Sequence, residues 1–217
     1  TSGTCFAVGK QTCQNHRKAT DSEATCLEFW LPMICKSSSW RGFSNPGTSY
    51  FEICDTRSGD VASKVLLGSQ CEFLVSDVFS GYARAVRETN KLRENLTPIK
   101  NVYCNAHARR KFKEAKERFP NEARWFIDQY KLIYRLEDEA RGKPPDEILG
   151  LRKQMTPTFT KMKSRAMADI AGYSSKSSLA RAMAYFLENY EGLTLFVTDS
   201  RLPIDNNPQE RLMRNPV

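Results

Sequence analysis

The strongest constraint on the fold is the segment CEFLVSD, residues 71–77. Its apolar residues are consecutive rather than alternating, which is typical of a strand buried on both faces of a parallel sheet. The segment TSYFEICD, residues 48–55, also has the aromatic and β-branched composition of a strand. Between them, SGDVASKVLLG predicts a short helix with Ser58 as N-cap and Gly68 at its end. We therefore expect a right-handed parallel crossover between the two strands.

Asp77 stands at the carboxyl end of the second predicted strand. Functional groups of open α/β sheets gather at the carboxyl ends of their strands, so this position favours a functional carboxylate. Asp is also a common N-cap, and capping of the next turn or helix is the competing interpretation. The segment IKNVYCNAH, residues 99–107, predicts the next strand. A second carboxylate within reach of Asp77 would favour the functional interpretation.

Positive charge is concentrated in one part of the chain. The 217 residues carry a formal net charge of +8 at pH 7. Between Arg84 and Arg118, eleven Lys and Arg residues stand against four Glu residues, which leaves +7 in that segment. This charge favours a polyanionic partner, nucleic acid ahead of a membrane surface. No apolar run approaches the roughly 18 residues that a membrane span needs, so we expect no membrane partner.

The segment HARRKFKEAKERF, residues 107–119, predicts an amphipathic helix. Its apolar face carries Ala108, Phe112, Ala115 and Phe119 at helical spacing. Two interpretations of the basic side are open: a solvated helix face, or a track of contacts with DNA phosphates. The candidate DNA contacts are His107, Arg109, Arg110, Lys113 and Lys116.

Seven cysteines occur, at positions 5, 13, 26, 35, 54, 71 and 104, without a Cys-x-x-Cys pair. The odd count favours reduced thiols in a cytosolic protein over a disulfide framework. Cys104 and His107 have a spacing found in zinc sites. Two ligands do not make a closed site, and the only other histidine is His16, so packing or a phosphate contact explains His107 better.

Helical patterns dominate residues 120–190. EARWFIDQYKLIYRLEDEAR carries an apolar stripe, and SSLARAMAYFLENYEG begins at serine caps and ends at Gly192. We interpret both stripes as core, together with Met155, Met162, Met167 and Met183. A short strand and the start of a helix are expected to follow. Residues 1–47 lack sustained periodicity and are expected to be irregular.

The segment LPIDNNPQERL, residues 202–212, places Asp205 and Glu210 around two asparagines and a proline. Pro208 is favoured at the first helical position, which makes Asn207 the N-cap and Glu210 the third residue of a helix. Glu210 could then bond back to the cap, as in a capping box. A capping role is compatible with a metal-binding role, because a helix can begin inside an active site.

Three segments, FLVSDVFSGYARAV, CNAHARRKF and LPIDNNPQERLMR, resemble in this order the signatures of bacterial insertion-sequence transposases of the sixty-six family. CDTRSGDVASKVLLG resembles the segment that precedes the second catalytic Asp in that family. The resemblance covers roughly residues 48–217. It implies an α/β fold with an RNase H-like mixed sheet, whose partial core spans 48–105 and 193–217. A basic and largely helical insertion would span 106–192.

The family uses an Asp, Asp, Glu triad, and the resemblance implies Asp77 as its second Asp and Glu210 as its Glu. Both would bind Mg²⁺ or Mn²⁺, hard ions that suit carboxylate and phosphate oxygens. Two such ions about 4 Å apart can activate water or a 3′-hydroxyl and stabilise the leaving oxygen. Arg211 and Arg214 could hold a nearby phosphate. The implied activity is DNA cleavage and strand transfer at element ends and target DNA, by a homo-oligomer at the bacterial nucleoid in the cytoplasm.

The first Asp of the triad has no counterpart in residues 1–76. Asp21 has no strand pattern around it, and Asp55 matches the segment before the second Asp. The sequence begins with Thr1 rather than Met, which indicates a fragment, and residues 1–47 suggest a disrupted element. We therefore expect a chain that binds metal weakly and is close to inactive. The alternatives are a non-catalytic nucleic-acid-binding module that uses the helix at 107–119, and a nuclease of the same fold.

Overall fold

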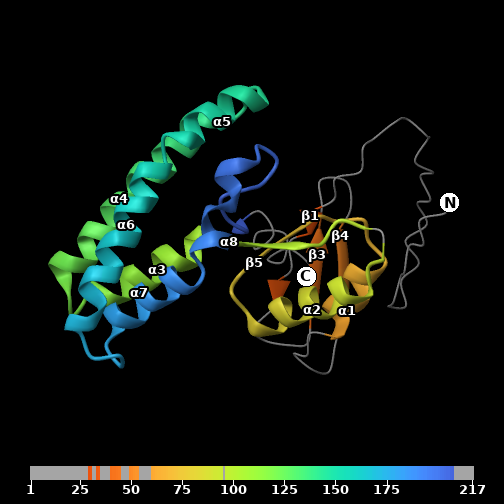
Figure 1. The fold of residues 1–217 in the computed structure, drawn as a ribbon, viewed down its shortest axis with the longest axis horizontal. Helices are drawn as coiled ribbons and strands as arrows, with labels where there is room; N and C mark the ends of the chain where they lie inside the picture. Colours follow the sequence, from red (N-terminus) through yellow and green to blue (C-terminus); the bar gives the residue numbers. More distant parts are fainter. Residues whose placement is uncertain are drawn as a thin grey trace.

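A computed structural model of the chain shows two neighbouring bodies, one of strands with two helices and one of helices alone (Figure 1). The structure describes residues 29–30, 33–34, 40–44, 49–53, 60–94 and 96–207, with side chains from residue 62 onward. One body holds the strands and the first two helices, and the other is built from long helices. The carboxyl-terminal part of the described chain returns between them (Figure 1).

The strands form two three-stranded sheets within the described residues. The parallel sheet has the order β1-β5-β6, with β1 (Phe29–Trp30), β5 (Phe73–Ser76) and β6 (Lys100–Tyr103). The antiparallel sheet has the order β2-β3-β4, with β2 (Met33–Ile34), β3 (Trp40–Ser44) and β4 (Ser49–Ile53). The structure thus has strands between residues 29 and 44, where the sequence shows no periodic pattern.

The predicted crossover between residues 48–55 and 71–77 is wrong in its pairing. Both segments form strands, but β4 pairs antiparallel with β3, whereas β5 pairs parallel with β1 and β6. The helix between them, α1 (Asp60–Leu67), therefore connects two different sheets, and Gly68 follows it as predicted. The parallel crossover instead runs from β5 through α2 (Ser80–Leu92) to β6. The predicted cap Ser58 lies outside the described residues.

The helical body confirms the predicted apolar stripes. Phe112 stacks on Phe126 with ring centroids 4.4 Å apart, and both are buried beside Tyr130. Met167 is the exception, because 61% of its surface is exposed, so its interpretation as core is wrong. The helices are α3 (Asn105–Ala115), α4 (Pro120–Ala140), α5 (Pro145–Lys153), α6 (Thr156–Asp169) with the 3-10 turn η1 (Ile170–Gly172), and α7 (Ser178–Glu188).

The start of α7 confirms the predicted serine cap, but its end differs from the prediction. The Ser177 hydroxyl accepts a hydrogen bond from the Ala180 N–H at 3.1 Å. Gly192 does not end the helix, because it lies inside the next one, α8 (Tyr190–Thr194). The short strand expected next is a 3-10 helix instead, η2 (Leu195–Thr198). The apolar residues of this segment pack on the core as helical turns rather than as a strand.

A buried cation fixes the approach to the last described segment. Arg152 of α5 is only 4% exposed and donates to both carboxylate oxygens of Glu137, at 2.9 and 2.5 Å. It also donates to the carbonyl oxygens of Phe196 and Asp199, at 2.9 and 2.8 Å. A buried charge needs such partners, because removing one leaves the other uncompensated. Arg152 therefore ties α4 and α5 to the chain just before residues 202–207.

We expect Gly192→Ala to destabilise the protein. Gly192 is buried where α8 packs on β6, and an added Cβ would overlap the ring of Tyr103. Overpacking of this kind costs about 1–3 kcal/mol, measurable by urea denaturation. The matched control is Gly150→Ala in α5, where a Cβ meets nothing within 4 Å. The control should be neutral or slightly stabilising, and equal loss in both variants would contradict the packing argument.

Candidate active site

Asp77 lies at the carboxyl end of β5, where the next strand ends beside it. The backbone N–H of Cys104, directly after β6, donates to the carbonyl oxygen of Ser76 at 2.9 Å. Asp77 is half-buried and follows Ser76 directly. Helix α2 begins at Ser80 with Phe79 as its N-cap residue, so Asp77 is not the N-cap of that helix. Helices α2 and α3 both begin at this edge, and their positive N-terminal ends favour anionic groups there.

Residues 202–207 return to this same edge. The backbone N–H of Asn105 donates to the carbonyl oxygen of Ile204 at 3.1 Å, and its side-chain amide donates to the same oxygen at 3.2 Å. The N–H of Asn206 donates to the Cys104 sulfur at 3.5 Å. The chain just before Glu210 is therefore bonded to the strand end that neighbours Asp77. Residues 208–217, with Glu210, Arg211 and Arg214, lie outside the described part, as does the predicted capping box.

Asp205 has a clear structural role that the sequence analysis did not assign. It is only 8% exposed. One carboxylate oxygen accepts from the Tyr134 hydroxyl at 3.1 Å and from the Asn207 side-chain amide at 2.7 Å. The other accepts from the backbone N–H of Asn207 at 3.1 Å. Asp side chains often accept a hydrogen bond from the backbone two residues later, so the bond from Asn207 could have been predicted from the sequence. The contact with Tyr134, 71 residues away, could not.

Two tyrosines from the helical body reach the strand edge. Burial raises the pKa of Tyr134 above its ordinary value, and the negative charge of Asp205 raises it further. Burial also raises the pKa of Tyr185, with contributions from Cys104 and Asp77. The N–H of Val78, next to Asp77, donates to the Tyr185 hydroxyl and opposes this shift. Both phenols are therefore neutral at physiological pH.

Cys104 is a buried thiol at the junction of β6 and α3. Burial raises its pKa from 9.0 to about 11, although the N–H groups of Asn206, His107 and Ala106 favour the thiolate. The larger effect is burial, so the sulfur is neutral at pH 7 and serves as a weak hydrogen-bond acceptor. Its role here is to hold Asn206.

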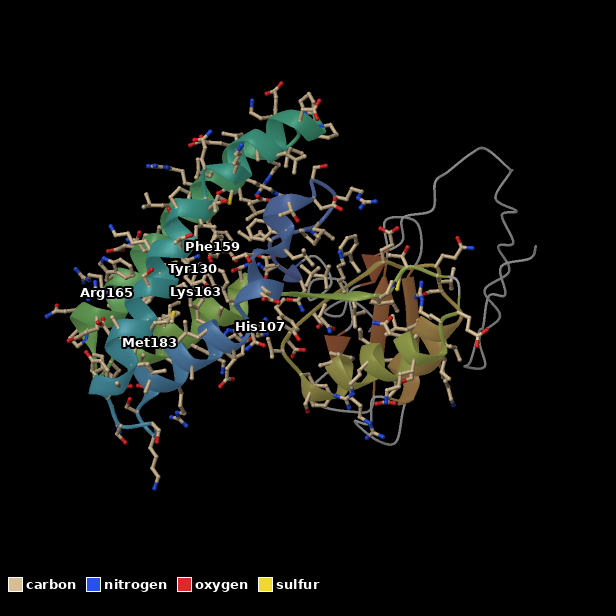
Figure 2. All side chains as sticks on the ribbon, viewed as in Figure 1. His107, Tyr130, Phe159, Lys163, Arg165 and Met183 are labelled. Atoms are coloured by element: carbon tan, nitrogen blue, oxygen red, sulfur yellow. The ribbon has the colours of Figure 1, made fainter. Side chains whose placement is uncertain are left out.

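The basic residues of α3 divide into two groups. Arg109 and Lys111 are half-buried and lie over the rings of Tyr134 and Tyr185, at 5.3 and 4.6 Å from the ring centroids. His107 is also half-buried and lies at the end of α3 nearest the strands (Figure 2). The exposed basic residues of the predicted track are Arg110, Lys113 and Lys116.

The described residues supply an incomplete set of metal ligands. Among residues with described side chains, no group of three or more His, Cys, Asp and Glu could hold a metal ion. Asp77 offers a hard carboxylate at the strand edge, which fits Mg²⁺ or Mn²⁺ as one ligand. Both carboxylate oxygens of Asp205 already accept hydrogen bonds from Tyr134 and Asn207. A metal site that includes Asp77 would therefore need further ligands from side chains outside the described residues.

Comparison with known proteins agrees with the motif resemblance. The family model described as "Transposase IS66 family" matches residues 18–217. The chain therefore belongs to this family of insertion-sequence transposases. The match confirms the family resemblance drawn from the three signature segments.

Three relatives come from Sinorhizobium fredii (strain NBRC 101917 / NGR234). The chain is 29% identical to uncharacterized protein y4jD over 190 aligned residues. The aligned region covers 87% of this chain and 36% of that protein. It is 28% identical over 207 residues to uncharacterized protein y4hP, covering 89% and 36% respectively. Uncharacterized protein y4qI is 29% identical over 187 residues, covering 85% and 34%. The chain thus spans between 34% and 36% of the length of these relatives.

No helix in the described part is long and apolar enough to cross a membrane.

The raised pKa of Cys104 predicts a pH-dependent loss of stability. A thiol whose pKa rises on folding stabilises the fold fully below pH 9, and this contribution is lost as the pH rises from 9 to about 11. The slope is about 1.4 kcal/mol per pH unit for one group. Urea denaturation between pH 8 and 10 should show a steeper decline for the wild type than for Cys104→Ala. If the unfolding free energies of the two proteins fell in parallel with pH, the raised pKa of Cys104 would be contradicted. The buried tyrosines lower the unfolding free energy only above about pH 10.

Proposed function

We propose that this chain is part of the catalytic domain of a DDE-type transposase, which cleaves DNA and transfers strands at the strand edge that carries Asp77. The observation that carries the proposal is the return of residues 204–206 to the ends of β5 and β6, bonded to Asn105 and Cys104. Glu210 follows four residues after Asn206. Family membership supports a transposase-related function. Asp77 supplies one carboxylate at this edge, and the proposal assigns the second carboxylate to Glu210.

The fold is consistent with an RNase H-like mixed sheet. Strand β1 ends at Trp30 and β2 begins at Met33, and β1 also contacts β3. We infer that β1 and β2 act as one interrupted strand, which joins the two sheets in the order β4-β3-β2/β1-β5-β6. The proposed core then comprises residues 48–105 and 193–217, together with β1 to β3. Residues 106–192 form the proposed basic and helical insertion.

The proposed chemistry uses Asp77 and Glu210 as ligands of Mg²⁺ or Mn²⁺. Such ions activate the attacking oxygen and stabilise the leaving oxygen of a phosphodiester. The residues of this chain would bind the ions, place the DNA phosphate and limit access of water. The N-terminal ends of α2 and α3 add positive potential at the same edge. Because the first Asp of the triad has no assigned position, we expect weak metal binding and low activity.

The proposed DNA contacts extend from the strand edge along α3. Arg110, Lys113 and Lys116 are exposed, and none of the ion pairs among the described residues involves them. Arg109 and His107 lie closer to the strands, and Arg211 and Arg214 follow Glu210. Exposed cations give affinity without reading the base sequence. The same observation favours a second candidate function, a nucleic-acid-binding module without catalysis.

Metal binding tests the proposed function. We expect weak Mn²⁺ binding by the wild-type chain in calorimetry, and loss of that binding in both Asp77→Asn and Glu210→Gln, because each removes one ligand charge. The matched control is Asp146→Asn, an exposed carboxylate in the first turn of α5. The control should bind Mn²⁺ as the wild type does. If all four proteins behave alike, Asp77 and Glu210 do not share a metal site.

Salt dependence of DNA binding tests the track on α3. Each phosphate contact contributes about 0.9 to the slope of log K against log salt concentration. The double variant Arg110→Ala/Lys113→Ala should reduce that slope by up to about 2, measured by fluorescence anisotropy on duplex DNA. Lys153→Ala, an exposed cation at the end of α5, is the control with no expected change. Unchanged binding in the double variant would place the DNA elsewhere. DNA binding that survives in a chain without Mn²⁺ affinity would favour the non-catalytic module.

A further inference from the structure

The hydrogen bond between Tyr134 and Asp205 joins the helical body to the segment that leads to Glu210. These residues are 71 positions apart in the sequence, and their side chains meet at 3.1 Å. Tyr134 is in α4, whereas Asp205 lies in the return segment beside Cys104 and Asn105. The contact therefore spans the boundary between the proposed insertion and the proposed core.

We propose that Tyr134 and Asp205 are positioning residues that hold residues 204–207 against the strand edge, and that this hold favours metal binding by the Asp77 and Glu210 pair of the proposed function. This inference rests on the proposed function for its metal-binding consequence. The hold on residues 204–207 does not depend on that function, because the hydrogen bonds of Asp205, Asn105 and Cys104 carry it.

Asp205 acts as the centre of this arrangement. It accepts three hydrogen bonds, one from outside the segment and two from Asn207, and it is almost fully buried. A buried carboxylate is stabilised by such donors, and losing one leaves part of its charge unsatisfied. The two bonds from Asn207 fix the local turn, and the bond from Tyr134 fixes where that turn lies.

Tyr134 is suited to act as a permanent donor. Its raised pKa keeps the phenol protonated across the physiological range. The Arg109 guanidinium lies over its ring at 5.3 Å from the centroid, which restrains the ring without occupying its hydroxyl. The helix behind it is anchored in the core through Tyr130 and Ile133, which are both fully buried. The hydroxyl is thus presented from a rigid element.

Tyr134→Phe tests the proposal, because it removes one hydroxyl and keeps the ring. We expect hydrogen exchange of the Asn206 and Asn207 amides to accelerate roughly fivefold, the loss that matches one hydrogen bond. We also expect Mn²⁺ affinity in calorimetry to fall by a similar factor, with little change in the thermal midpoint. Asp205→Ala, which removes all three acceptor interactions, should accelerate exchange further.

The matched control is Tyr130→Phe, four residues earlier on the same helix. Within the described residues the buried Tyr130 hydroxyl has no hydrogen-bond partner, so its removal should change neither exchange nor Mn²⁺ affinity. Unchanged exchange in Tyr134→Phe would overturn the proposal. Faster exchange with wild-type Mn²⁺ affinity would overturn the proposed effect of the pair on metal binding. A wild-type chain that binds no Mn²⁺ would contradict the proposed function, while the exchange rates would still decide whether the pair holds residues 204–207.

Discussion

The arrangement of the strand edge depends on Asn105, a fully buried amide at the start of α3. Its side chain donates to the carbonyl oxygens of Leu193 in α8 and Ile204 in the return segment, at 2.8 and 3.2 Å. A buried carbonyl group without a partner is costly, so these hydrogen bonds stabilise the junction. One polar residue thus joins the end of β6, the helix that covers it, and the chain before Glu210.

Arg152 has a similar role for the chain that precedes residues 202–207. It fixes the carbonyl groups of Phe196 and Asp199 to α4 and α5, whereas Asn105 fixes Ile204 to the sheet. The chain between residues 196 and 204 is therefore held at both ends by buried polar groups. Such groups contribute specificity of position, because apolar packing alone tolerates small shifts of the backbone.

Local sequence patterns predicted the helices and strands better than they predicted which strands pair. The apolar stripes of α4 and α7, the serine cap at Ser177 and the strand at residues 73–76 follow from periodicity and side-chain type, which act over a few residues. Strand pairing does not, so β4 was expected in the wrong sheet. The candidate site shows the same limit. Asp77 could be selected from its place at a strand end, but the contact of Asp205 with Tyr134 depends on residues that meet only in the folded chain.

The close union of the two bodies has an evolutionary consequence. A helical segment that was attached to the rest of the fold only at its two ends could be exchanged between relatives or shortened without affecting that fold. Here α4 and α7 supply tyrosines to the strand edge, and α3 grows directly out of β6. The segment from α3 to α7 is thus not a detachable module, and a chimaera assembled at its ends would break these contacts with the strand edge. Variation within this part of the family should therefore be correlated across the junction rather than confined to either side of it.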